Sequence, residues 1–234
     1  MARKESVLIT GGASDIGYAC RKLLNAQGVQ TVCLLNSNSH AAKSLDHEAV
    51  YEVDLRETEK VLSTIDLIQE SYHISSFISL AGFNIPSSFM DFREELLWHH
   101  LLVNAIAPLQ IARRLIPSMK ESGYGRIALT SSIGVKFGGS DQHFPYSFSK
   151  HCGEFIPSEM NKLAADNIFT NVIRVGVTDT RKIRSLGKDL FQRASLIPAK
   201  RLAQPAEIAE FLVWISSKKN HYITGQIIGC SGGE

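Results

Sequence analysis

The residues best suited to acid–base chemistry are a tyrosine and a lysine four positions apart, Tyr146 and Lys150. Side chains at this spacing lie on one face of a helix, so the phenol and the ammonium would point into the same space. A free tyrosine, with a pKa of about 10, is a weak acid–base catalyst at neutral pH. A nearby cation favours the phenolate and lowers that pKa, which suits proton transfer to or from an alcohol oxygen. The same spacing would also occur on a helix face exposed to solvent. The rest of the chain decides between a catalytic pair and such a face.

The composition is that of a soluble globular protein, with 44% hydrophobic and 21% charged residues among 234. The net charge is +2 and no dense basic block is present, which argues against a nucleic-acid partner. No apolar run approaches membrane-spanning length, and the first residues do not read as a signal peptide. We therefore expect one cytoplasmic domain over residues 1–234, with no membrane association.

Neither the cysteines nor the histidines have the spacing of a metal site. The four cysteines are far apart, and we expect buried free thiols in a reducing compartment. Among the eight histidines only His99 and His100 are adjacent, and their side chains are expected to face different ways. The sequence predicts no bound metal.

Short apolar segments alternate with helical periodicity along the chain. The predicted strands cover residues 7–9, 31–35, 49–53, 76–80, 126–130, 170–175 and 226–229, and the predicted helices cover 16–27, 61–68, 92–119, 146–166 and 207–216. Pro108 should kink or divide the third helix, and Pro157 should bend the fourth. This alternation predicts an α/β fold: a Rossmann-type, doubly wound parallel sheet in three α/β/α layers.

A glycine-spaced turn, Gly11 to Gly17, follows the first strand and opens the first helix. Such a turn presents free N–H groups and the positive end of a helix dipole to a phosphate, so it indicates a dinucleotide site. Ligands of these sheets bind at the carboxyl ends of the strands. The polar and glycine residues expected at that edge are Ala81-Gly82, Ser131-Ser132 and Gly176.

Together these motifs resemble the short-chain dehydrogenase/reductase family in its simple single-domain form, over nearly the whole chain. The motifs are Thr10-Gly11 to Gly17, Asp54-Leu55, Ala81-Gly82, Trp98 six residues before Asn104, Ser132, Tyr146 with Lys150, Gly176 to Thr180, and Gly225 to Gly233. The resemblance implies an NAD(P)-dependent oxidoreductase that transfers a hydride between nicotinamide and a carbonyl or secondary alcohol.

The resemblance also implies a catalytic role for each of four residues. Tyr146 would be the general acid in reduction and the general base in oxidation, and Ser132, or its neighbour Ser131, would stabilise charge on the substrate oxygen. Lys150 would lower the pKa of Tyr146 and bind the nicotinamide ribose. Asn104 would hold a water that links Lys150 to solvent, although an asparagine in a helix can also be satisfied locally.

The cofactor-binding residues implied by the resemblance lie at the same sheet edge. They are Gly11, Ser14, Asp15, Ile16, Gly17, Asn36, Ser37, Asp54, Leu55, Ala81, Gly82, Tyr146, Lys150, Val177 and Thr180. Leu35 stands where NAD-preferring members carry a carboxylate, and small polar residues follow it. NADP is therefore favoured over NAD.

Three positions depart from the family pattern. Asp15 replaces the second glycine of the turn, where it would either repel phosphate or, the preferred interpretation, cap the first helix and weaken cofactor binding modestly. Ser79-Leu80 replaces an asparagine pair, which should remove side-chain bonds between neighbouring strands. Val175 replaces a proline before Gly176.

The substrate is expected to contact loops 83–95, 133–145 and 180–200. The last loop is basic, which fits either an anionic substrate or, preferably, a solvated amphipathic helix. Two other functions fit the same residues: a dehydratase or epimerase that recycles bound nicotinamide, and a non-catalytic dinucleotide sensor. The resemblance further implies a homodimer or homotetramer formed through helices 92–119 and 146–166.

Overall fold

Seven strands, all parallel, form one sheet in the order β3-β2-β1-β4-β5-β6-β7 within the residues that the computed structural model describes, 3–36, 45–185, 187 and 189–234. The strands are β1 (Lys4–Thr10), β2 (Gln30–Leu35), β3 (Glu48–Glu52), β4 (Tyr72–Ser79), β5 (Gly125–Ser132), β6 (Ile168–Val175) and β7 (Ile227–Cys230). Strand order reverses beside β1, between β1 and β4, which is where ligands bind in such sheets.

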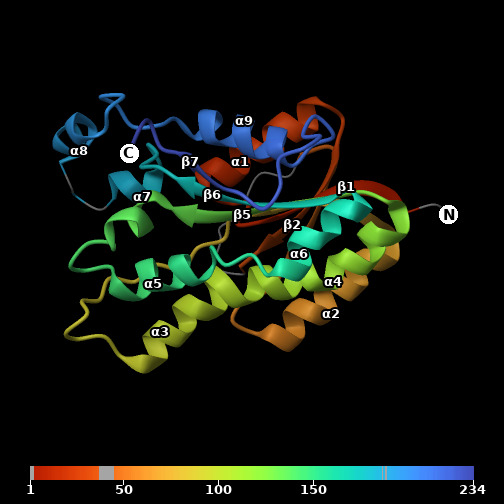
Figure 1. Ribbon diagram of the computed structural model, residues 1–234, viewed down its shortest axis with the longest axis horizontal. Helices are drawn as coiled ribbons and strands as arrows, with labels where there is room; N and C mark the ends of the chain where they lie inside the picture. The colour runs from red at the N-terminus through yellow and green to blue at the C-terminus, as the bar shows by residue number, and fades with distance from the viewer. Residues whose placement is uncertain (1–2, 37–44, 186, 188) are drawn as a thin grey trace.

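Helices cover both faces of this sheet (Figure 1). The α-helices are α1 (Asp15–Ala26), α2 (Thr58–Ser71), α3 (Glu94–Leu101), α4 (Ala107–Ser122), α5 (Phe144–Cys152), α6 (Ser158–Lys162), α7 (Arg181–Arg184), α8 (Leu190–Leu196) and α9 (Pro205–Ile215). Helices α1 and α9 lie along one face, and α2 and α4 lie along the other. The predicted three-layer α/β/α fold is confirmed.

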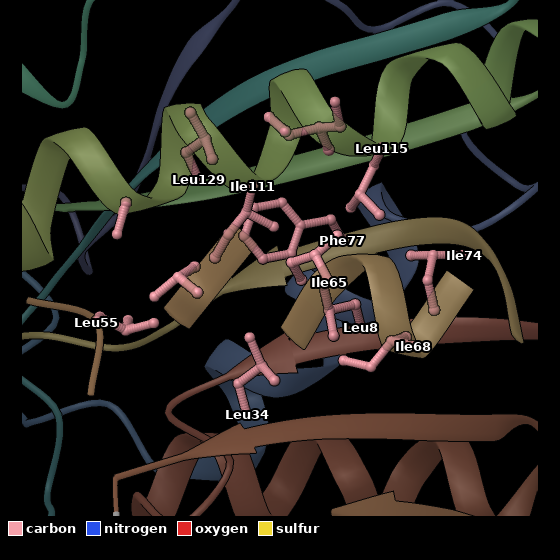
Figure 2. Close-up of a cluster of buried hydrophobic side chains, with 14 of the residues drawn as sticks. Leu8, Leu34, Leu55, Ile65, Ile68, Ile74, Phe77, Ile111, Leu115 and Leu129 are labelled. Atoms are coloured by element: carbon pink, nitrogen blue, oxygen red, sulfur yellow. The ribbon is translucent and has the colours of Figure 1, made fainter. Parts of the chain in front are cut away.

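Each face of the sheet has its own apolar core. In β1, Leu8 packs into the cluster under α2 and α4, whereas Ile9 packs into the cluster under α1 and α9. Phe77 of β4 lies between Ile65 and Ile111 in the first cluster (Figure 2). Truncating a fully buried isoleucine such as Ile111 would destabilise the fold by about 2–5 kcal/mol. Strands buried on both faces explain the near-continuous apolar runs in the sequence.

The long helix predicted over residues 92–119 is divided, but not at Pro108. A π-helical turn, η1 (Leu102–Ile106), separates α3 from α4, and Pro108 lies in the first turn of α4. Proline has no N–H to donate to the carbonyl four residues earlier, which here belongs to Asn104. The missing α-helical bond explains why the wider turn forms around Asn104.

The helix predicted over residues 146–166 is much shorter than expected. Helix α5 ends at Cys152, and after a break the short α6 and a 3₁₀ turn, η3 (Leu163–Asp166), complete the segment. Pro157 therefore caps α6 instead of bending one continuous helix. Residues 180–200 hold two short helices, α7 and α8, in place of the single amphipathic helix preferred from the sequence. Within the described residues, no helix is both long and apolar enough to cross a membrane.

Candidate active site

The carboxyl end of β5 and the first turns of α5 bring three of the predicted catalytic residues together. Ser132 is the last residue of β5, and its side chain hydrogen-bonds to Tyr146 on α5. Lys150 lies one turn beyond Tyr146, and its Nζ donates to the carbonyl oxygen of Thr130 at 2.9 Å. Tyr146 and Ser132 are half-buried, and Lys150 is only 5% exposed. The arrangement places a phenol, a hydroxyl and an ammonium at the ligand-binding edge of the sheet.

Ser131 and Ser132 point into different surroundings, as successive residues of a strand must. Ser131 donates from Oγ to Glu154 Oε1 at 2.7 Å, and Arg174 binds both oxygens of the same carboxylate at 2.7 Å each. Burial alone would raise the pKa of Glu154, but the bonds from Arg174 and Ser131 hold it below its ordinary value. Ser131 therefore belongs to a structural network, and Ser132 is the serine that faces Tyr146.

The pKa of Tyr146 is raised in this structure, because burial disfavours the phenolate more than the Ser132 hydrogen bond favours it. Lys150 is not among the causes of this shift, so the expected lowering of the Tyr146 pKa by Lys150 stays a prediction. The Lys150 ammonium binds the Thr130 carbonyl instead. Burial, with a smaller contribution from Lys182, lowers the pKa of Lys150 to about 8. At neutral pH the tyrosine is held as an acid with a proton to donate.

Asn104 is fully hydrogen-bonded within the protein and only 3% exposed. Its Oδ1 accepts from the backbone N–H of Phe83, and its Nδ2 donates to the Phe83 carbonyl and to Ser149 Oγ, all at 2.9 Å. The side chain thus ties the loop after β4 to helix α5. Gly153 also approaches this residue closely, because a Cβ there would lie 2.8 Å from the Asn104 carbonyl oxygen.

The glycine turn has the strand–turn–helix context that the sequence predicted. The cap of α1 is Ser14, not Asp15: Ser14 Oγ accepts from Gly17 N at 3.0 Å. Asp15 is the first residue of the helix, and its carboxylate binds Arg181 through Oδ1 and Oδ2 at 2.6 Å each. Neither interpretation of Asp15 drawn from the sequence included this ion pair.

A buried ion pair beneath the glycine turn was also missed by the sequence interpretation. Arg21 Nε and Nη2 donate to the two carboxylate oxygens of Glu48 at 2.5 Å each, and both side chains are fully buried. Nη1 of Arg21 donates to the carbonyl oxygen of Gly12 at 3.1 Å. This pair fixes the glycine turn to β3. An arginine in a helix usually lies on the surface. The sequence alone therefore does not show that Arg21 is buried and paired with Glu48 of β3.

The residues predicted to bind the adenosine half of the cofactor differ in their bonding and exposure. Asp54 is bound by Arg56 through both of its carboxylate oxygens, which lowers the pKa of Asp54, and Leu55 is buried in the core. Asn36 is exposed directly after β2. Ser37 lies outside the described residues.

Ala81 and Gly82 follow β4 beside the catalytic groups. Gly82 is exposed, and a Cβ added there would meet only Asn104 Oδ1, at 3.8 Å, so the space above it is open. Ser79, which stands in place of an asparagine, is still bonded to both neighbouring strands. Thr130 Oγ1 donates to the Ser79 carbonyl at 2.6 Å, and Thr10 Oγ1 lies 3.5 Å from Ser79 Oγ. Threonine side chains of the two neighbouring strands, β5 and β1, therefore connect those strands to β4.

The segment after β6 is held by backbone bonds. Ala203 N donates to the Val177 carbonyl at 3.1 Å, and Thr180 Oγ1 accepts from Ile183 N at 3.2 Å, which caps α7. Gly176 is packed so tightly that a Cβ would lie 2.6 Å from Ser231 Cα. These bonds therefore hold Val177 and Thr180 in a fixed turn, at the same edge of the sheet as Ser132.

Two of the three predicted substrate loops are joined to each other. Ser87 of loop 83–95 forms a parallel bridge with His143 of loop 133–145, and Ser87 N donates to Gln142 O at 2.9 Å. The rings of Phe89, Phe92 and Phe144 pack together beside this bridge. The two loops form one aromatic wall that ends two residues before Tyr146.

The rings of His99 and His100 both contact Phe83, with ring centroids 6.1 and 4.7 Å from it. His100 is fully buried, its Nε2 accepts from Ile85 N at 3.2 Å, and its Nδ1 lies 2.8 Å from the Leu96 carbonyl. These bonds define a neutral ring, and burial lowers the pKa of His100. Across the described residues, no group of three or more His, Cys, Asp or Glu side chains could hold a metal ion.

Comparisons with known proteins agree with this geometry. A family model described as enoyl-(acyl carrier protein) reductase matches residues 11–234. The 3-oxoacyl-[acyl-carrier-protein] reductase MabA of Mycobacterium bovis is 29% identical over 231 residues, which cover 97% of this chain and 92% of that protein. A 3alpha-hydroxysteroid dehydrogenase of Mediterraneibacter gnavus is 25% identical, with coverage of 99% and 97%.

A solved structure shares the fold. The 3-oxoacyl (acyl-carrier-protein) reductase of Agrobacterium tumefaciens C58, with NADP bound, superimposes with a TM-score of 0.88 at 20% identity, and covers 99% of this chain and 95% of that chain. The family match spans nearly the whole sequence and includes the glycine turn, Ser132, Tyr146 and Lys150. The chain belongs to the short-chain dehydrogenase/reductase family and is an NAD(P)-dependent oxidoreductase.

Proposed function

We propose that the protein reduces a carbonyl substrate with NADPH, with Tyr146 as the proton donor. The observation that carries this proposal is the Ser132–Tyr146 hydrogen bond, with Lys150 one turn away, at the open edge beside Gly82. The substrate carbonyl oxygen would accept hydrogen bonds from Ser132 Oγ and the Tyr146 hydroxyl. As negative charge develops on that oxygen, the phenolic proton of Tyr146 moves to it.

Lys150 and Asn104 would support this proton transfer. The buried Lys150 ammonium stabilises the phenolate left on Tyr146, and its low pKa, about 8, allows it to exchange protons near neutral pH. The backbone carbonyl of Asn104 would hold the water that connects Lys150 to solvent. In a regular helix this carbonyl accepts from the N–H four residues later, but that residue is Pro108, which has no N–H. The Asn104 side chain itself is occupied with Phe83 and Ser149.

The residues at the glycine turn fit a dinucleotide. Gly11 and Gly17 pack so closely that an added Cβ would lie 2.6 Å from Ala81 N and 2.4 Å from Gly11 O, respectively. The start of α1 would face the pyrophosphate, which would be bound by Gly11, Ser14, Ile16 and Gly17, with the Gly17 N–H already donating to Ser14 Oγ. When bound, the nicotinamide supplies the hydride. Ala81, Gly82, Val177, Thr180 and Lys150 would hold its ribose and ring.

The adenosine half would bind near Asn36, Ser37, Asp54 and Leu55. Leu35 is buried at the end of β2 and supplies no carboxylate for the ribose hydroxyls. The solved relative from Agrobacterium tumefaciens carries NADP. These two observations support NADP over NAD.

The substrate class best supported is a 3-oxoacyl thioester. The relative MabA is named as a 3-oxoacyl-[acyl-carrier-protein] reductase, and the aromatic wall of Phe89, Phe92 and Phe144 offers an apolar surface for an acyl chain next to Tyr146. We further propose a single domain over residues 1–234 that functions in the cytoplasm as a homodimer or homotetramer. Light scattering coupled to size-exclusion chromatography would measure the assembly.

The test is a spectrophotometric screen of NADPH and NADH oxidation against 3-oxoacyl thioesters, keto acids, keto-sugars, cyclic ketones and quinones. Tyr146→Phe should lose at least about 10²-fold in kcat. Tyr222→Phe is the matched control, because Tyr222 is 91% exposed, and it should retain full activity. Cofactor binding without reduction of any carbonyl, together with a ligand response unchanged in Tyr146→Phe, would overturn the reductase proposal.

A further inference from the structure

Asp15 and Arg181 join two segments that border the cofactor site and lie 166 residues apart in the sequence. The backbone N–H of Arg181 donates to Asp15 Oδ2 at 2.6 Å, and its Nε donates to Asp15 Oδ1 at 2.6 Å. Nη2 of Arg181 donates to the Ala13 carbonyl at 3.2 Å. Three hydrogen bonds therefore hold the first residue of α7 against the glycine turn and the first residue of α1.

This contact lies at the glycine turn, beside the proposed phosphate site. Thr180, which would hold the nicotinamide carboxamide, directly precedes Arg181 and caps the same short helix. Any movement of Arg181 away from Asp15 would carry Thr180 with it. The pair thus sets the position of the segment 180–184 relative to the glycine turn.

The ion pair also accounts for an acidic residue at a phosphate site. A carboxylate beside a pyrophosphate would repel it. Here the Arg181 guanidinium neutralises the charge of Asp15, whose side chain is 22% exposed, while that of Arg181 is 78% exposed. Solvent and salt reach such a pair, so it can open.

We propose that the Asp15–Arg181 pair is a strap that closes over the bound NAD(P) cofactor and slows its release. The proposal rests on cofactor binding at the glycine turn. Opening the strap separates segment 180–184 from that turn and frees the path by which the cofactor leaves. Asp15 and Arg181 are positioning residues, because neither reaches the reacting atoms at Tyr146.

The test is a stopped-flow measurement of NADPH release, followed by its fluorescence as excess NADP⁺ displaces it. Asp15→Asn and Arg181→Ala should each raise the dissociation rate constant about threefold to tenfold, because each removes the ion pair. The double variant should release NADPH no faster than the faster single variant, since both changes break one contact. Added salt should speed release from the unaltered protein more than from the variants.

Arg184→Ala is the matched control. Arg184 forms a similar two-bond ion pair with Asp179, at 2.7 Å for each bond, but within its own segment and not with the glycine turn. The control should keep the original release rate, and circular dichroism should confirm that every variant is folded. Release from Arg184→Ala as fast as from Arg181→Ala would overturn the proposal, because any loosening of the segment would then suffice.

Two other results would also overturn the strap. Additive effects in the double variant would show that the two residues act separately. Faster release in Arg181→Ala with unchanged release in Asp15→Asn would make Arg181 a direct phosphate ligand. Failure of the unaltered protein to bind either NADPH or NADH would instead refute the cofactor function itself, so the two failures can be told apart.

Discussion

Asn104 Nδ2 donates a 2.9 Å hydrogen bond to Ser149 Oγ, and so connects the π-helical turn to the helix that carries Tyr146 and Lys150. Ser149 Oγ in turn donates to the Tyr146 carbonyl at 2.8 Å. Both side chains are buried. The position of the catalytic helix therefore depends on a residue that is almost entirely shielded from solvent.

Asn104→Ala should destabilise the protein more than Ser149→Ala. The first substitution leaves the Phe83 N–H and carbonyl without their partner and should lower the free energy of unfolding by about 1–3 kcal/mol. The second removes one hydroxyl, at about 1 kcal/mol. Urea denaturation of both variants measures the difference. Equal losses would mean that the Phe83 bonds contribute nothing to stability.

The two neighbouring serines should separate chemistry from stability. Ser132→Ala should lower kcat about 10²–10³-fold with little change in stability, because it removes a group that stabilises charge on the substrate oxygen. Ser131→Ala should keep most of kcat and lower the free energy of unfolding by about 1.5–3 kcal/mol, since Ser131 donates to the buried Glu154 carboxylate. Steady-state kinetics and urea denaturation check both. The reverse pattern would exchange the two roles.

Lys150→Met should abolish most activity but raise stability near neutral pH. Burial, with Lys182 contributing, lowers the Lys150 pKa from 10.5 to about 8, so the unfolded chain binds more protons than the folded one between these values. The free energy of unfolding contributed by Lys150 therefore rises with pH across that window, and the buried charge destabilises the protein below it. The stability advantage of the Met variant should be greatest at about pH 7 and shrink towards about pH 10.5.

Urea denaturation of both proteins at several pH values measures this advantage, and only their difference is interpreted, because other groups titrate equally in both. Lys136→Met provides a control for the loss of one lysine side chain, since Lys136 is exposed. A difference for Lys150→Met that stayed constant with pH would show that its ammonium is not destabilised by burial.

Arg21→Ala should lower the free energy of unfolding by about 3–5 kcal/mol, because it leaves the Glu48 carboxylate buried without its partner. Arg21→Met combined with Glu48→Leu should recover much of that loss, since it removes both charges. Arg114→Ala, which breaks an exposed pair with Asp66, should change stability by less than about 1 kcal/mol. Thermal unfolding compares the three. A double variant as unstable as Arg21→Ala would mean that the charge is not the cause.

The features predicted correctly from the sequence are those that depend on residues close together along the chain. The strand–turn–helix around Gly11 and the spacing of Tyr146 and Lys150 need only a few neighbouring residues to be recognised. The strap and the Arg21–Glu48 pair could not be predicted, because Arg181 lies 166 residues from Asp15, and Glu48 lies 27 residues from Arg21. Pairings of this kind depend on which strands are neighbours. The end of α5 at Cys152 was missed because periodicity continued through a break made by Gly153 and Pro157.

The central place of β1 has a consequence for how the protein is made. Strand β1 pairs with β4, about 70 residues later, and all the strand pairs among the described residues are parallel, so none of these pairs can form as a simple hairpin. The glycine turn gains its last partner only when Arg181 has been synthesised. Contacts of such sequence separation form slowly. A nascent chain should therefore remain unable to retain a dinucleotide until Arg181 has emerged.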